Sequence, residues 1–468
     1  MSDTSTRFSK RRKLLAVRSN AQKVAQTLRQ TLGAGKKIQL RALLDQQHPA
    51  DLADAMFFLN NAEEKVVFDA LDAAEAAEVL DEVDDATEAN LIRDTSHERL
   101  ADILEELPSD EGADIVGGLD AVTAEQVLAL TDSETAADIR TLLAYPDDTA
   151  GGIMSKGYVD VPLAATQAQA LSRFREKTDA EHIFYVYVLD ERGGLHGVVD
   201  LRTLLRAQPT TPVRDLMTEQ VISVPPETDQ EHVAEIFARY DLMALAVVAE
   251  SEPFGKLLGV ITADDIIDVI QEESDEDIAH LAGSDAQELE NKSPAQVAKL
   301  RMPWIMATLF IELIAGFVIH HFDTTLTKFI LLASFMPIIS AISGNTGLQS
   351  AAIIIRGLST GQVQLSHWKH ALARQVATTA ILGGACATVL GIIGAVWDRH
   401  WAFGLVVFLG MFMSVNIAGV VGTVIPLISK RLGFDPALTA GPFETAFQDV
   451  VGISIFLSLA STLLHWLR

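Results

Sequence analysis

The sequence predicts a multidomain chain: an all-α acidic domain and an α/β domain, then a connecting helix and an α-helical membrane domain. The first observation is charge, because residues 38–301 carry 18 Lys/Arg and 56 Asp/Glu, whereas residues 302–468 carry eight and six. The second is an alternation of short apolar strands with helices within residues 146–270. The third is a set of five apolar stretches after residue 302, each about as long as or longer than the roughly 20 residues that cross a bilayer.

The first 37 residues are expected to form a basic tail. They hold ten Lys/Arg and one acid, and Arg11-Arg12-Lys13 would suit contact with anionic lipid or a disordered tail equally well. The acidic stretch that follows has a net charge of 18 − 56 = −38. Such a field repels nucleic acid and attracts cations, although an ordinary solvated acidic surface is the simpler alternative. We therefore expect no nucleic-acid partner.

Residues 38–145 are expected to form a helical acidic N-domain. Apolar residues recur at spacings of three and four, and segments that begin near His48, Asp72 and Pro108 repeat one plan. Each has a polar or proline start and then an acidic helix with one apolar stripe. Short helices of this kind bury little surface alone, so we predict that they stack into a small superhelix.

Residues 146–270 are expected to form an α/β domain with an internal duplication. The predicted strands are residues 158–161, 183–189, 195–200, 221–224, 245–249 and 258–262, with helices over 164–177 and 229–239. Glycine-bearing turns separate these elements. The two halves therefore read as two consecutive βαβ-like units.

A connecting helix over residues 271–301 is expected to lead into a membrane domain over residues 302–468. The five predicted spans are about 303–321, 328–356, 371–396, 403–429 and 438–466. The side of the membrane richer in basic residues is normally cytoplasmic. One side would carry Lys292, Lys299, Arg301, Arg356, Lys369, Arg374, Lys430 and Arg431, and the other Lys328, Arg399 and Arg468. This places the acidic half inside the cell and the C-terminus outside.

Polar and helix-weakening residues interrupt the second span. After Pro337 the chain reads Ser343-Gly-Asn-Thr-Gly-Leu-Gln349. We expect this run to weaken the helix and free backbone carbonyls, which are tolerated at membrane depth where they line water or are buried in protein. The alternative is a packing face of small residues against a neighbouring helix. The candidate ion-path residues here are Gly344, Asn345, Thr346 and Gly347.

Carboxylates lie at membrane depth in the fifth span. Thr445 and Asp449 are one helical turn apart on one face, after Gly441, and Asp435 precedes the span. Oxygen ligands suit Mg²⁺, and the absence of a Cys or His cluster argues against zinc or copper. Glu444 and Glu312 are further acids at this depth, each open to a role as pore group, proton-binding site or packed neutral carboxyl.

Five motifs stand out along the chain: His48-Pro-Ala-Asp-Leu-Ala-Asp-Ala, Tyr145-Pro-Asp-Asp-Thr-Ala-Gly-Gly, Tyr240-Asp-Leu-Met-Ala-Leu, Ser343-Gly-Asn-Thr-Gly-Leu-Gln and Asp435-Pro-Ala-Leu-Thr-Ala-Gly-Pro. Through these motifs and the order of its domains, the chain resembles the MgtE magnesium channels. The duplicated domain is similar to a pair of cystathionine-β-synthase (CBS) modules through residues 195–205 and 258–270. CBS pairs are regulatory sensors on many carriers and alone name no activity.

The resemblance implies a homodimer in the plasma (inner) membrane, with Mg²⁺ as transported ion and as intracellular regulator. Asp449 matches the family's pore aspartate, and Asp435 an acid that faces the connecting (plug) helix. The remaining candidate metal ligands are acids of the cytosolic part: Asp110, Asp114, Asp264, Asp265, Asp268, Glu272, Glu273, Glu276 and Asp277. ATP at the CBS pair is a further implied ligand.

The sequence departs from the family pattern at a few membrane positions. Ser343 and Leu348 replace a Gly and an Asn of the second-span motif, Ala446 replaces a Thr, and Glu444 adds a charge. These changes bear on ion selectivity and leave Mn²⁺ or Co²⁺ transport, or altered regulation, as alternatives. An anion channel is disfavoured because no Lys or Arg falls well inside a predicted span. An enzyme or ATP-driven pump is disfavoured because no phosphate-binding loop is present.

Overall fold

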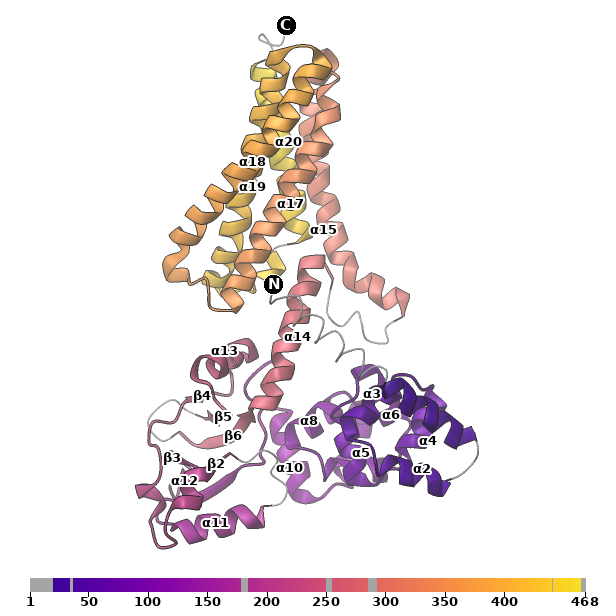
Figure 1. Cartoon of the computed structure of the whole chain (residues 1–468), viewed down its shortest axis with the longest axis vertical. Coiled ribbons are helices and arrows are strands. Elements are labelled where there is room, and N and C mark those ends of the chain that lie inside the picture. The colour runs from indigo at the N-terminus through magenta and orange to yellow at the C-terminus, as the bar shows by residue number, and fades with distance from the viewer. Residues whose placement is uncertain are drawn as a thin grey trace, which may run out of the picture. The chain divides into compact units, whose positions relative to one another are not determined.

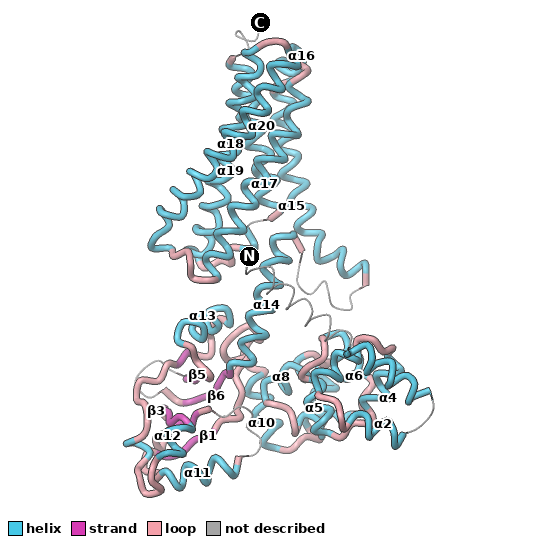
Figure 2. Tube along the Cα trace, in the orientation of Figure 1, coloured by secondary structure: helices cyan, strands magenta, loops and turns pink. Residues whose placement is uncertain are grey.

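The computed structural model describes residues 20–33, 37–177, 184–249, 255–284, 293–439 and 441–463. The chain forms two compact units, residues 1–269 and 270–468, and each is considered by itself. Figures 1 and 2 show the helical and the mixed parts of the chain. The predicted fold class is confirmed: helical N-domain, α/β CBS pair and five long apolar helices.

The N-domain is a stack of short helices. They are α2 (Lys37–Leu44), α3 (Pro49–Met56), α4 (Asn61–Phe68), α5 (Ala73–Leu80), α6 (Asp85–Arg93), α7 (His97–Leu104), α8 (Ser109–Gly117), α9 (Ala121–Leu128) and α10 (Ser133–Leu142). Most begin after a polar cap: the side chains of Asn60 and Asp72, for example, accept hydrogen bonds from the first-turn amides. Repeated capping explains why the acidic sequence breaks into many short helices.

The basic tail predicted over residues 1–37 is partly wrong. Residues 20–33 are helical, and Ala21, Val24, Ala25 and Leu28 are buried. The last three pack into the same core as α2 to α10. The segment of residues 20–33 has apolar residues at helical spacing among its basic ones, and this apolar face explains why the segment packs on the N-domain.

The CBS pair consists of two small sheets. The first contains β1 (Val159–Pro162), β2 (Tyr185–Leu189) and β3 (Leu195–Asp200); the second contains β4 (Ser223–Val224), β5 (Ala244–Val248) and β6 (Leu257–Thr262). In each, the first strand pairs parallel and the third antiparallel to the middle strand. Helices α11 (Gln167–Glu176), α12 (Leu201–Arg206) and α13 (Gln230–Tyr240) complete the modules. The repeated topology agrees with the duplication predicted from the sequence.

The second CBS module shares one hydrophobic core with the N-domain. Side chains of β5 and β6, such as Val247 and Ile261, belong to the same buried cluster as Ile139 of α10. Helix α14 (Ala263–Ala282) starts directly after β6, and its Ile266 and Val269 also enter this core. The start of α14 is therefore fixed against both domains.

Five helices are long and apolar enough to cross a membrane. They are α15 (Pro294–His321), α17 (Leu332–Ser359), α18 (Trp368–Asp398), α19 (Trp401–Leu432) and α20 (Pro442–Thr462), and they run side by side in Figure 1. A short helix, α16 (Asp323–Lys328), separates the first two, so the second span starts later than the predicted residue 328. Buried Phe335, Phe403 and Phe456 lie at the centre of their packing.

The single connecting helix predicted over residues 271–301 is wrong. Helix α14 begins earlier, at Ala263, and ends at Ala282, where Gly283 adopts a positive φ of 72°. Helix α15 starts anew at Pro294, after Ser293 as its N-cap. A glycine at φ > 0 is a common helix stop, and proline suits the first turn of a helix.

Candidate ion path in the membrane helices

Asp449 of α20 contacts two other membrane helices. The Oγ hydroxyl of Ser340 in α17 donates a hydrogen bond of 2.7 Å to its Oδ1. The carboxyl of Glu312 in α15 lies within hydrogen-bonding reach of the same side chain. No Lys or Arg forms an ion pair with Asp449 among the described residues. Two carboxyls and a hydroxyl thus offer only oxygen atoms, which suit a hard cation.

Helix α17 stays continuous through the motif that begins at Ser343. The expectation that the motif weakens the helix and frees its carbonyls is therefore wrong. Instead Gly344 and Gly347 are buried and let other helices approach closely. A Cβ on Gly344 would lie 3.2 Å from Cγ2 of Thr445, and one on Gly347 would lie 2.1 Å from Oε1 of Glu444. These two glycines instead fit the alternative interpretation, in which small residues of α17 form a packing face against a neighbouring helix.

The motif divides between two faces of α17. Thr346 is buried, and its Oγ1 donates to the carbonyl of Ile342 at 2.8 Å. Asn345 and Gln349 are exposed, one helical turn apart. Gly344 therefore lies close to Thr445, whereas the Asn345 side chain is exposed on the surface of the chain.

Asp435 lies in the loop between α19 and α20 and contacts α14. Its Oδ2 is 3.3 Å from Nδ1 of His280, whose Nε2 is 3.6 Å from Oε1 of Glu276. Burial alone would raise the pKa of Asp435, but the nearby His280 ring and hydrogen bonds from the backbone amides of Ala437 and Leu438 hold that pKa below its usual value. The carboxyl of Asp435 thus favours its charged form.

The backbone beside this pair is also tightly packed. Gly441 has φ 69°, and a Cβ there would lie 2.8 Å from the carbonyl oxygen of Leu281. The Leu281 side chain packs on Ala351, Ile355 and Ala437. Gly441 is therefore required where α14 meets the start of α20.

Acids of α8 and α14 meet between the N-domain and the second CBS module. Asp110 is 7% exposed, and its Oδ1 has no hydrogen-bond partner among the described residues. Burial and repulsion from Asp265 raise the pKa of Asp110 to about 8, and burial raises the pKa of Glu111 to about 9. Burial also raises the pKa of Asp265, although Thr262 donates two hydrogen bonds to its carboxyl. Close carboxyls of this kind repel one another when both are charged.

The other predicted metal ligands are dispersed along α14. Asp264, Asp268, Glu272 and Glu276 are exposed, and Glu273 and Asp277 are partly exposed. Within the described part of the chain, no group of three or more His, Cys, Asp or Glu side chains is positioned to hold a metal ion. Asp114, one turn after Asp110 on α8, contributes to the negative field at that carboxyl.

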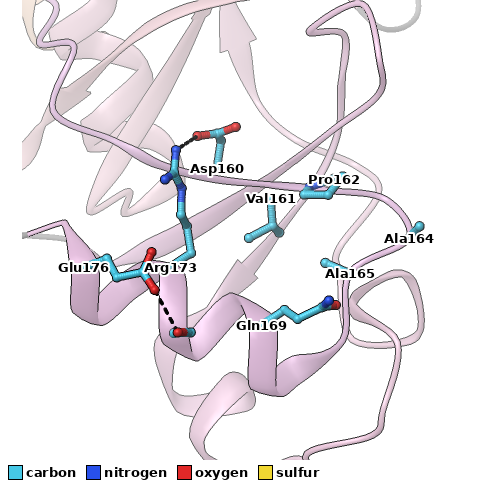
Figure 3. A pocket seen from close by; sticks show the side chains of 9 residues that line it. Asp160, Val161, Pro162, Ala164, Ala165, Gln169, Arg173 and Glu176 are labelled. Carbon is cyan, nitrogen blue, oxygen red and sulfur yellow. Dashed lines mark hydrogen bonds and ion pairs between the residues drawn. The ribbon is translucent and has the colours of Figure 1, made fainter.

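A cavity of about 520 Å³ lies between β1 and α11 (Figure 3). Its lining residues are Asp160, Val161, Pro162, Ala164, Ala165, Gln169, Ser172, Arg173 and Glu176. None of these is a predicted site residue. Nη2 of Arg173 lies 3.9 Å from Oδ1 of Asp160, so the one basic side chain already faces a carboxylate.

Three contacting residues were missed from the sequence: Ser340, Gln448 and His280. Ser340 was detectable, because Ser340, Gly344 and Gly347 place small residues at spacings of three and four. His280 carried a weaker signal, four residues after Glu276 on one helix face. Gln448 follows Glu444 at the same spacing.

Five apolar helices with carboxyls in their interior, joined to a regulatory CBS pair, define a membrane transport protein for cations. Residues 336–459 match the family of MgtE divalent cation transporters, residues 47–148 match the MgtE intracellular N domain, and residues 150–210 and 213–272 match CBS domains. The chain belongs to the MgtE family, which is a family of transporters and not a class of enzymes.

Curated relatives cover most of the chain. It is 35% identical over 340 residues to a magnesium transporter MgtE of Bacillus subtilis, covering 72% of this chain and 74% of the relative. It is 36% identical to a magnesium transporter MgtE of Thermus thermophilus, with the same coverage. The crystal structure of the cytosolic domain of the Mg²⁺ channel MgtE in complex with ATP is 38% identical and covers 52% of this chain and 99% of that one, with a TM-score of 0.50.

Proposed function

We propose that this protein carries Mg²⁺ across the plasma membrane along a path that includes Asp449. The observation that carries the proposal is the contact of Asp449 with Ser340 and Glu312 at membrane depth. An acid there requires a cation or a proton, because an unpaired charge is costly in lipid. Oxygen-only donors favour Mg²⁺, and the magnesium transporters to which the chain is similar support the same ion.

The test is Mg²⁺ influx into liposomes that hold the purified full chain, without ATP. Asp449→Ala should abolish influx, and Asp449→Asn, which keeps the shape but removes the charge, should lower it strongly. Asp323→Asn is the matched control, since Asp323 is an exposed acid of α16. Wild-type influx in Asp449→Ala would refute the path. Preference for Mn²⁺ or Co²⁺ in competition would replace Mg²⁺ as the substrate.

Intracellular Mg²⁺ is proposed to close the path by binding to the acidic domains. The buried carboxyl of Asp110 and the partly exposed carboxyl of Asp265, which repels it, support this, because a bridging cation would remove that repulsion. The ion must bind the closed state more tightly for this coupling to work. Neutralising Glu272, Glu273, Glu276 and Asp277 together should leave the path open at high internal Mg²⁺. Normal closure of that variant, with no Mg²⁺ protection of residues 145–301 from protease, would exclude the mechanism.

The chain is further proposed to act as a homodimer with its N-domain in the cytoplasm and its C-terminus outside. The exposed Asn345 and Gln349 support this, because polar residues on an outer face of a membrane helix need a polar or protein neighbour. Cysteine crosslinking at Asn345 would trap a dimer if α17 faces its counterpart. ATP binding to the CBS pair is proposed from the relative crystallised with ATP and is measurable by calorimetry.

A further inference from the structure

Glu444 is a fully enclosed carboxyl in the first turn of α20. Its side chain is 0% exposed. Nε2 of Gln448 donates a hydrogen bond of 3.1 Å to its Oε1, whereas Oε2 is buried and has no hydrogen-bond partner among the described residues. A carboxyl with one hydrogen-bonded and one unpartnered oxygen, five residues before Asp449, is not explained by the ion path described above.

The carboxyl of Glu444 fills the space beside Gly347. A Cβ on Gly347 would lie 2.1 Å from Oε1, 2.8 Å from Cδ and 2.9 Å from Oε2 of Glu444, and these are its three nearest atoms. On another side, a Cβ on Gly422 of α19 would lie 2.3 Å from the Gly347 carbonyl oxygen. Gly347 is thus held between the Glu444 carboxyl and the α19 backbone, which fixes α17 relative to α20.

The surroundings of Glu444 favour a neutral carboxyl. Burying an unpaired carboxylate is costly, and the positive end of the α20 dipole offsets only a small part of that cost. Within the described residues, no ion pair reaches Glu444. The charged or titratable groups on the elements packed around α20 are Arg356 of α17, Lys430 and Arg431 of α19, Lys299, Arg301, Glu312, His320 and His321 of α15, Asp323 and Lys328 of α16, and Glu276, His280 and Asp435 near its start.

We propose that Glu444 is a proton-binding positioning residue: its protonated carboxyl sits against Gly347 and sets the spacing between α17 and the helix that carries Asp449. Loss of the proton would place an unpaired charge in this enclosed space. The carboxylate would then recruit water or leave Gly347, and the spacing would change. The effect on transport rests on the proposed function. The protonation of Glu444 and its contact with Gly347 do not.

The contact is tested by a rescue experiment on the full chain in liposomes. Gly347→Ala should lower Mg²⁺ influx by at least about tenfold, because its Cβ overlaps Glu444. Adding Glu444→Ala should restore influx to the level of Glu444→Ala alone. Gly422→Ala is the matched control, since its Cβ meets backbone and Glu444→Ala should not rescue it. Size-exclusion profiles of the three single variants and the two double variants report folding independently of transport. Failure of the rescue, or equal rescue of Gly422→Ala, would overturn the contact.

The proton is tested by infrared difference spectroscopy of the full chain between pH 6 and 9. The wild type should lose a protonated-carboxyl band as the pH rises, and Glu444→Gln should lack that component while Glu312→Gln retains it. Influx should fall with rising pH in the wild type and change less than about twofold in Glu444→Gln, since the amide cannot ionise. Identical band changes in wild type and Glu444→Gln would overturn the proposal, even if the protein transported no Mg²⁺.

Discussion

Replacing Asp110 by asparagine should stabilise α8 increasingly as the pH rises. The folded chain keeps Asp110 protonated up to its pKa of about 8, whereas the unfolded chain loses that proton near the ordinary value of 3.8. Between these values the unfolded state binds fewer protons, so stability falls by about 1.4 kcal/mol per pH unit. The accumulated cost is about 4 kcal/mol at pH 7 and less than half of that at pH 5.

Asparagine leaves a polar group of the same shape buried but removes the need for a proton. We therefore expect a gain of about 2–4 kcal/mol at pH 7, and a smaller one at pH 5. The assay is hydrogen exchange of the α8 amides in the full chain with EDTA, comparing variant and wild type at each pH. Asp102→Asn, at an exposed acid of α7, is the control and should change stability by less than about 0.5 kcal/mol.

Equal protection of α8 in wild type and Asp110→Asn at pH 7 would refute this reasoning. It would mean that the carboxyl of Asp110 is hydrated in solution, or that another group already stabilises its charge. A second consequence follows in Mg²⁺. If the cation relieves the repulsion from Asp265, Mg²⁺ should protect α8 in the wild type and much less in the variant.

Three further outcomes are expected. Ser340→Ala removes the 2.7 Å hydrogen bond to Asp449, worth about 1.5–3 kcal/mol to a charged acceptor, so influx should fall by roughly tenfold or more without loss of folding. His280→Ala breaks the contact with Asp435 and should speed hydrogen exchange at the end of α14, whereas unchanged exchange would exclude a tethering role. Phe456→Ala, at a fully buried ring, should lower unfolding stability by about 3–5 kcal/mol in detergent melts.

Local patterns in the sequence were enough for the elements and their order. Hydrophobic length alone located five membrane helices, because backbone groups in lipid must be satisfied within a helix. Period-two strands between glycine turns located both CBS sheets, and strand 195–200 was predicted to the residue. The N-domain helices followed from apolar spacing and polar caps. Each of these signals depends on neighbours within a few residues.

Where the local signals were weaker, the predictions were wrong, chiefly at the boundaries between domains and helices. The buried face of residues 20–33 was concealed by a strongly basic composition, and only its packing against the N-domain core identifies it. Gly283 and Pro294 could have indicated the break between α14 and α15, but a continuous acidic helix was expected instead. The glycines of α17 did not weaken the helix, because neighbouring helices fill the space that they leave.

The sequence by itself singled out candidate cation ligands, since the acids of the fifth predicted span and the loop before it offer oxygen atoms. It placed Asp449 and Asp435 as candidates, whereas the contacts to Ser340 and His280 required the tertiary structure. The enclosure of Glu444 beside Gly347 is likewise invisible in the chain, because these residues are almost one hundred positions apart. Residue chemistry is local, but burial, shared protons and repulsion between carboxyls depend on which helices meet, and only packing decides that.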